Sequence, residues 1–184
     1  MAFRRDFLSR DFTMPAADPL SRLLTIGAPA LERQASSVAW PDATLAQEVE
    51  ALHETLAAFR QRHGFGRAIA APQLGIHRRF IAVNLDGNRH TLVNPYIIWR
   101  SSKLFDVWDD CMSVPDIEVK ERRNTSISVA FANATGALHA WRRLRADISE
   151  LLQHEIDHLD GILMLSRAID DSSIRPKAPV ANRV

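Results

Sequence analysis

The segment His154-Glu155-Ile156-Asp157-His158 constrains this chain more than any other part of its sequence. Apolar residues around it recur at helical spacing and predict a helix from about Asp147 to Leu159, followed by Gly161. Side chains four residues apart on a helix share one face, so both imidazoles are placed to hold one metal ion. The alternative is a surface helix that carries two histidines by chance.

A helical projection favours the metal site over this alternative. At about 100° per residue the helix has one apolar arc, formed by Ile148, Leu151, Leu152, Ile156 and Leu159. The opposite side carries Glu150, Asp157 and Asp160. His154 and His158 flank the arc, whereas Glu155 falls inside it. A carboxylate among leucines is costly unless a charged or hydrogen-bonding group meets it. A water on the metal ion is such a partner, which predicts Glu155 as the general base.

A metal ion held by two histidines needs a third protein ligand to complete an open tetrahedral site. The helix offers no further histidine at suitable spacing, so the only cysteine, Cys111, is the candidate. It lies beside predicted strands, in the segment Trp108-Asp109-Asp110-Cys111-Met112-Ser113-Val114-Pro115. The alternative is a small buried apolar residue, which is the commoner role of an isolated thiol. A single cysteine also excludes an internal disulfide framework.

Composition places this helix in an ordinary globular domain. The 184 residues are 46% hydrophobic and 24% charged, and 23 Lys and Arg against 22 Asp and Glu give a net charge of +1. These values exclude a disordered chain, a coiled coil and a collagen-like repeat, and they argue against a non-specific nucleic-acid binder. No apolar run reaches the roughly 18 residues that a membrane span requires. We expect a cytoplasmic protein without membrane contact or direct nucleic-acid specificity.

The remaining pattern predicts an α+β domain with mostly antiparallel sheets. A first helix runs from Leu45 to about Gly64, with Thr44 as its N-cap and Gln47 completing a capping box. Strands are predicted at Phe80–Leu85, Thr91–Val93, Tyr96–Trp99, Lys103–Val107, Ser126–Phe131 and Ala137–Leu144. Strands this close in sequence favour antiparallel pairing. We divide the chain into a polar extension (1–18), a single metallohydrolase domain (19–170) and a loose tail (171–184).

Three segments, in this order, resemble the motifs of the peptide deformylase family. The first is Gly66-Arg67-Ala68-Ile69-Ala70-Ala71-Pro72-Gln73, similar to the family's glycine-rich segment. The second is Asp109-Asp110-Cys111-Met112-Ser113, where the family has Glu-Gly-Cys-Leu-Ser, and the third is HExxH at 154–158. The similarity runs from about Leu23 to about Arg167. Three ordered motifs are much more specific than any one of them.

The resemblance implies mostly antiparallel sheets packed around the C-terminal HExxH helix, with a second, N-terminal helix. The implied metal ligands are Cys111, His154 and His158. The implied catalytic groups are Glu155, Gln73 and the backbone N–H of Met112, the last two as donors to the transition state. Taken alone, Gln73 is equally well explained as a loop glutamine that bonds the turn backbone.

The implied reaction is removal of the N-formyl group from the N-terminal methionine of nascent peptides. The implied cofactor is one divalent metal ion per chain, Fe²⁺ in cells, which Zn²⁺, Ni²⁺ or Co²⁺ can replace in isolated protein. Transient association with the ribosome is a weaker expectation, because the tail supplies only three dispersed basic residues, Arg175, Lys177 and Arg183.

The predicted substrate-binding residues are Arg67, Ala68, Ile69 and Asp110, and several of them depart from the family pattern. Many members pair this stretch with the substrate as an added strand, and Ala68 replaces a glycine there. Arg67 would place a charge beside the substrate channel, or else is a solvated side chain. Asp110 adds an acid at a glycine position, and Asp109 is expected to pair with Arg123. These departures favour altered substrate choice over altered chemistry.

Two other functions remain open at this point. A related enzyme would use the same metal centre to hydrolyse another N-formyl or N-acyl compound. A binding protein on a deformylase scaffold would no longer turn over, although the complete set of Gln73, Cys111, His154, Glu155 and His158 argues against it.

Overall fold

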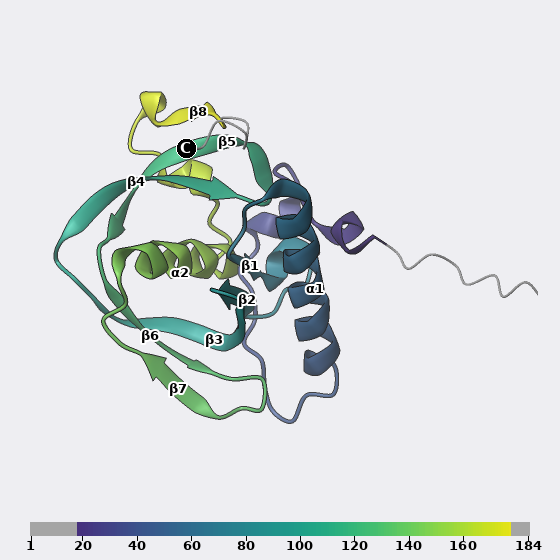
Figure 1. Ribbon diagram of the computed structural model, residues 1–184. Helices are drawn as coiled ribbons and strands as arrows, with labels where there is room; N and C mark the ends of the chain where they lie inside the picture. Colours follow the sequence, from purple (N-terminus) through teal and green to yellow (C-terminus); the bar gives the residue numbers. More distant parts are fainter. Residues whose placement is uncertain (1–17, 178–184) are drawn as a thin grey trace, which may run out of the picture.

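The computed structural model describes residues 18–177 of the chain. Two antiparallel sheets and two α-helices form the domain (Figure 1), which confirms the predicted α+β class. The five-stranded sheet has the order β1-β2-β3-β6-β7 and consists of β1 (Ala68–Ala70), β2 (Phe80–Leu85), β3 (Asn88–Arg100), β6 (Ile127–Ala132) and β7 (Leu138–Trp141). The three-stranded sheet has the order β4-β5-β8 and consists of β4 (Leu104–Cys111), β5 (Val114–Asn124) and β8 (Ile174–Pro176).

The two helices cover opposite faces of β2, whose residues Phe80–Val83 are completely buried. Ile81 and Val83 pack in one core cluster with the apolar side of α2 (Ala146–Leu159). Phe80 and Ala82 point the other way, into a second cluster with α1 (Leu45–His63). A continuous apolar run is typical of a strand that is buried on both faces. In Figure 1, α2 lies between the two sheets and α1 lies outside.

The ends of both helices agree with the sequence, except for one capping contact. Gly64 ends α1 in the left-handed conformation, with φ of 74°. Gly161 follows α2 with φ of 73°, and a Cβ there would come within 2.6 Å of the Glu32 carbonyl oxygen. The predicted capping box at Thr44 is wrong, because its side chain makes no capping hydrogen bond. Asp42 Oδ1 instead accepts from the backbone N–H groups of Thr44 and Leu45, at 3.0 and 2.9 Å.

The largest strand missed by sequence reasoning is β5. Six of its eleven residues are charged, so it lacks the apolar alternation that marks a strand. Cross-strand ion pairs compensate, as between Arg122 and Asp106 of β4 at 2.7 Å. The predicted strands Thr91–Val93 and Tyr96–Trp99 are parts of one strand, β3, whose pairing with β6 shifts register between Val93 and Tyr96. The intervening Pro95, which lacks an N–H donor, falls at this irregularity.

The predicted loose tail is corrected for its first residues. Ile174–Pro176 form β8, which pairs with β5 in the register Ile117↔Pro176 and Val119↔Ile174. The rest of the tail, 178–184, and residues 1–17 of the predicted extension lie outside the described residues. Within the described part, no helix is both long and apolar enough to span a membrane.

Candidate metal centre

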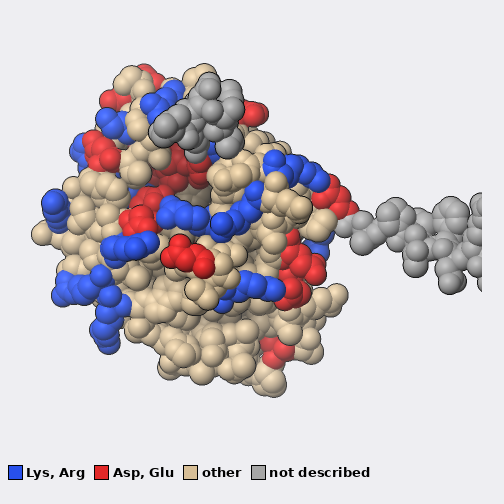
Figure 2. Space-filling view, in the orientation of Figure 1, with Lys and Arg blue, Asp and Glu red and all other residues tan. Residues whose placement is uncertain are grey.

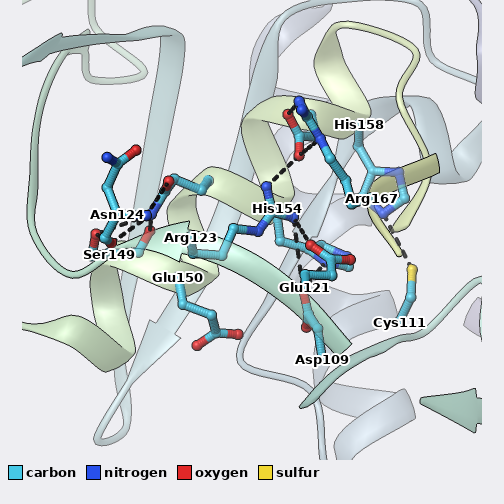
Figure 3. A network of polar contacts seen from close by, with 12 residues as sticks. Asp109, Cys111, Glu121, Arg123, Asn124, Ser149, Glu150, His154, His158 and Arg167 are labelled. Carbon is cyan, nitrogen blue, oxygen red and sulfur yellow. Dashed lines mark hydrogen bonds and ion pairs between the residues drawn. The ribbon is translucent and has the colours of Figure 1, made fainter. Parts of the chain in front are cut away.

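The three predicted metal ligands meet in the structure. Cys111 ends β4, and His154 and His158 lie one turn apart on α2. One ligand atom from each lies within 4.8 Å of the other two, and all three residues are buried. The Cys111 sulfur is 3.2 Å from His158 Nε2 (Figure 3). A thiol and two imidazoles that converge inside the protein suit a divalent transition metal.

A carboxylate fixes the orientation of one imidazole. Asp109 Oδ2 lies 2.8 Å from His154 Nδ1, which leaves His154 Nε2 as the nitrogen for a metal ion. Burial opposes protonation of His154, but Asp109 and Cys111 outweigh it and raise the pKa of His154 well above its usual value. Burial and the neighbouring His154 lower the pKa of His158. Metal ligation needs neutral rings, and the charge of a bound cation would favour the neutral form of His154.

Behind this pair, Arg123 joins three acidic side chains. It contacts Glu121, lies 2.5 Å from Asp157 Oδ2, and forms the expected ion pair with Asp109 at a longer distance of 3.9 Å. Asp157, placed on the solvent side by the helical projection, is therefore part of this network. Asp109, Glu121 and His154 also come within 4.8 Å of one another, but the guanidinium of Arg123 already neutralises these carboxylates. The group of Cys111, His154 and His158 is therefore the better candidate to hold a metal ion.

Glu155 lies next to the ligands and is 3% exposed. Its Oε2 has no hydrogen-bond partner among the described residues. Burial raises the pKa of Glu155 to about 7. A carboxyl group whose pKa lies near neutral pH is suited to accept and return a proton.

Gln73 is held with its amide nitrogen toward the site. Its Oε1 accepts a hydrogen bond from Ala70 N at 2.8 Å, and Nε2 donates to Ser113 Oγ at 3.0 Å. Nε2 also lies 3.8 Å from the Cys111 sulfur. The amide of Gln73 therefore bonds the turn backbone through Oε1 and directs its Nε2 toward the candidate ligand Cys111. Met112 follows Cys111 directly in the β4–β5 turn.

A cavity of about 510 Å³ opens onto these residues. Of the predicted substrate-binding residues, Arg67, Ala68 and Asp110 line it, whereas Ile69 is fully buried in the core cluster with α1. Asn84 N donates to Arg67 O at 2.8 Å. Because antiparallel bonds alternate along a strand, the backbone groups of Ala68 point away from β2. Ala68 thus presents the outer edge of β1 to the cavity.

Sequence reasoning missed two charged residues of this cavity, Arg60 and Glu150. The helical projection put Glu150 on the solvent side, but it is 8% exposed and lines the cavity wall. Arg67 Nη2 donates to Glu150 Oε2 at 3.1 Å, and Arg67 Nη1 donates to the Asp147 carbonyl oxygen at 3.0 Å. Arg67 is therefore an ion-pair partner rather than a purely solvated side chain. Figure 2 shows acidic side chains in a hollow of this face, with basic side chains beside it.

Comparison with known proteins gives a consistent result. The family profile described as polypeptide deformylase matches residues 20–173. A peptide deformylase of Heliobacterium modesticaldum is 33% identical over 154 residues, covering 82% of this chain and 95% of the relative. One from Dictyoglomus thermophilum is 32% identical, covering 80% and 92%. The crystal structure of peptide deformylase from Thermotoga maritima superposes with a TM-score of 0.73 at 29% identity, covering 80% of this chain and 97% of that one.

Proposed function

The chain belongs to the peptide deformylase family, and on this premise we propose that it removes the N-formyl group from the N-terminal methionine of nascent peptides. The observation that carries the proposal is the convergence of Cys111, His154, His158, Glu155 and Gln73 on one buried site. A formyl amide needs a water made nucleophilic at neutral pH and donors for the developing oxyanion. These five side chains can meet both needs.

Cys111, His154 and His158 would hold one divalent metal ion, because they offer one thiolate and two imidazole nitrogens within a buried cluster. When bound, the ion supplies Lewis acidity, which lowers the pKa of water and polarises a carbonyl group. We propose Fe²⁺ in cells and Zn²⁺, Ni²⁺ or Co²⁺ as substitutes in isolated protein. Asp109 holds the ring of His154 in the orientation that this ligation needs.

Glu155 is the proposed general base. Its buried Oε2 takes the proton of the attacking water and returns it to the amine that leaves when the C–N bond of the formyl amide breaks. Gln73 Nε2 and the backbone N–H of Met112 are the proposed donors to the oxygen of the formyl group. An amide donor keeps its N–H groups at every physiological pH, since it does not titrate.

The edge of β1 is the proposed support for the peptide. The backbone N–H and C=O of Ala68 face the cavity and are placed to pair with an extended chain. Ile69 would contribute only by fixing β1 against α1. We further propose that residues 19–170 act as one metallohydrolase domain in the cytoplasm, with transient contact to the ribosome.

A second candidate is hydrolysis of another N-formyl compound by the same groups. The observation that favours it is the Arg67–Glu150 ion pair, which lies in the cavity wall one helical turn before His154. An apolar methionine side chain resting on this pair would remove it from water without replacing its hydrogen bonds, which is unfavourable. A first residue with a polar side chain would not incur this cost.

A substrate comparison tests both candidates. Fe²⁺-loaded protein under anaerobic conditions is assayed for release of formate or acetate from formyl-Met-peptide, formyl-Met, acetyl-Met-peptide and formyl-Ser-peptide. The proposed function requires the highest kcat/KM on formyl-Met-peptide. Faster turnover of the serine peptide would favour the second candidate, and release from none of them would contradict both.

A further inference from the structure

Strand β8 and Lys177, the residue that follows it, contact residues of the cavity wall. In β8, Ile174–Pro176 pair with β5, and the Lys177 N–H extends this ladder by donating to the Asp116 carbonyl oxygen at 2.8 Å. Residues two apart in an extended segment point to the same side. Arg175 and Lys177 therefore share one side of the segment, and both contact residues that line the cavity.

Lys177 connects two walls of the cavity. Its Nζ lies 2.7 Å from Asp110 Oδ2, on β4, and 2.9 Å from the ring centroid of Phe65, which lies between α1 and β1. The Lys177 side chain is only 5% exposed, whereas that of Asp110 is 29% exposed. The Lys177 ammonium group is therefore buried, and the Asp110 carboxylate that it neutralises is the more accessible of the two groups to a ligand in the cavity.

Arg175, unlike Lys177, contacts Trp108 and Glu118. Its guanidinium stacks 3.7 Å above the ring of Trp108, another residue of the cavity wall, and donates two hydrogen bonds to Glu118 at 3.1 and 2.9 Å. Glu118 is paired with Arg175 rather than directed at the cavity. Arg175 therefore supports the wall by packing, and Lys177 is the residue of this segment that sets the charge of the wall.

Two acids of the cavity wall each have a cation as partner. Glu150 is paired with Arg67, and Asp110 is paired with Lys177. Asp110 stands where the peptide deformylase motif has a glycine, so this acid is a departure of this chain from the motif. It directly precedes the candidate ligand Cys111 and borders the space through which a peptide reaches the site.

We propose that Lys177 is a specificity-determining residue: by neutralising Asp110 it allows peptides with acidic residues after the first to enter the cavity. This inference rests on the proposed deformylase function. Removing the ammonium group would make the wall more negative at the partly exposed Asp110, which would repel acidic peptides and attract basic ones. The effect would fall on substrate binding, because neither residue is placed to touch the formyl group.

Lys177→Met tests this, since it removes the charge and keeps the length of the side chain. KM and kcat are measured on the metal-loaded full chain with formyl-Met-Glu-Glu, formyl-Met-Lys-Lys and formyl-Met-Ala-Ser. We expect KM for the acidic peptide to rise about three- to tenfold and KM for the basic peptide to fall, with the larger change at low salt. Lys177→Arg, which keeps the positive charge, should leave the KM values of the three peptides in the same order as in the original chain. Lys103→Met, at an exposed site outside the cavity, is the matched control.

Asp110→Asn is a second test, needed if the loss of Lys177 disrupts the pairing of β8 with β5. It removes the negative charge that faces the Lys177 ammonium group, so KM should shift in the opposite sense and favour the acidic peptide. Combining it with Lys177→Met should return the ratio of acidic to basic KM to that of the original chain. Equal changes for all three peptides, independent of salt, would overturn the proposal in favour of a packing role.

A binding measurement separates this inference from the function on which it rests. Calorimetric Kd values of Met-Glu-Glu and Met-Lys-Lys, the deformylated products, need no turnover. A charge-dependent change in Kd without formate release would contradict the deformylase function while supporting the role of Lys177. Formate release without any charge-dependent change in KM or Kd would retain the function and overturn the role of Lys177.

Discussion

Asp109 Oδ2 lies 2.8 Å from His154 Nδ1, and both groups are buried. This contact leaves Nε2 of His154 as the nitrogen available to the proposed metal ion and holds the ring in place. Carboxylates that bond a ligating histidine in this way commonly strengthen metal binding about 10- to 100-fold. Asp109→Ala should weaken metal affinity by this factor, whereas Asp109→Asn, which keeps an acceptor oxygen, should weaken it less. Competition with a chelator measures both, and unchanged affinity in Asp109→Ala would contradict the assignment.

Glu155→Gln should retain the metal ion and the fold but lose most turnover. The amide is nearly isosteric with the carboxylate but cannot accept the proton of the attacking water. Loss of a general base typically costs about 10²–10⁴-fold in kcat. Steady-state kinetics and metal analysis of the same sample provide the test. Turnover within a few fold of the original chain would place the base on another residue.

Arg67 and Glu150 should be tested together, because they form one ion pair in the cavity wall. Arg67→Leu alone leaves the buried Glu150 carboxylate uncompensated, so we expect KM to rise for acidic peptides and to change little for neutral ones. The double variant Arg67→Leu, Glu150→Leu makes the wall apolar. It should lower KM for formyl-Met-peptides about fourfold for each methylene newly buried, at ~0.8 kcal/mol each. A higher KM in the double variant would show that the pair is needed for binding.

We expect the buried His53 to reduce the free energy of unfolding in mild acid. It is buried on α1, with Nε2 3.0 Å from Thr91 Oγ1, and burial lowers its pKa from 6.5 to about 4. The unfolded chain therefore binds a proton more readily between these values, so the contribution of His53 is complete above pH 6.5 and is lost as the pH falls toward 4. Urea unfolding at pH 7.5 and 5 should show a larger decrease for the original chain than for His53→Gln, measured in the same metal state. Equal decreases would exclude His53 as the cause.

The cluster of candidate metal ligands could be predicted from the sequence because its residues follow local rules. The spacing of His154 and His158 follows from helix geometry, and Cys111 was the only thiol available. Glu150 and Asp157 could not be placed correctly by a helical projection. The projection assumes one buried face, but α2 is covered by sheets on more than one side. Charged residues on its other side therefore meet Arg67 and Arg123 instead of solvent.

The strands, too, could be predicted from the sequence only in part. β2 was evident from its apolar run, whereas the charged strand β5 and the short strand β8 depend on partners distant in sequence. The ion pairs that stabilise β5 involve Asp106 and Arg175, on the strands to either side. No local pattern in 114–124 or 174–176 encodes those pairings. Ion pairs between residues distant in sequence could not be predicted, either in the three-stranded sheet or in the cavity wall.

Titration of the metal-free chain with Fe²⁺ under anaerobic conditions, followed by formate release from formyl-Met-Ala-Ser, tests the central claim most directly. The centre formed by Cys111, His154 and His158 predicts that activity rises linearly and stops at one equivalent of metal per chain. Cys111→Ala, titrated beside it, should gain little activity over the same range. Activity that needs no metal, or that rises equally in Cys111→Ala, would contradict the account.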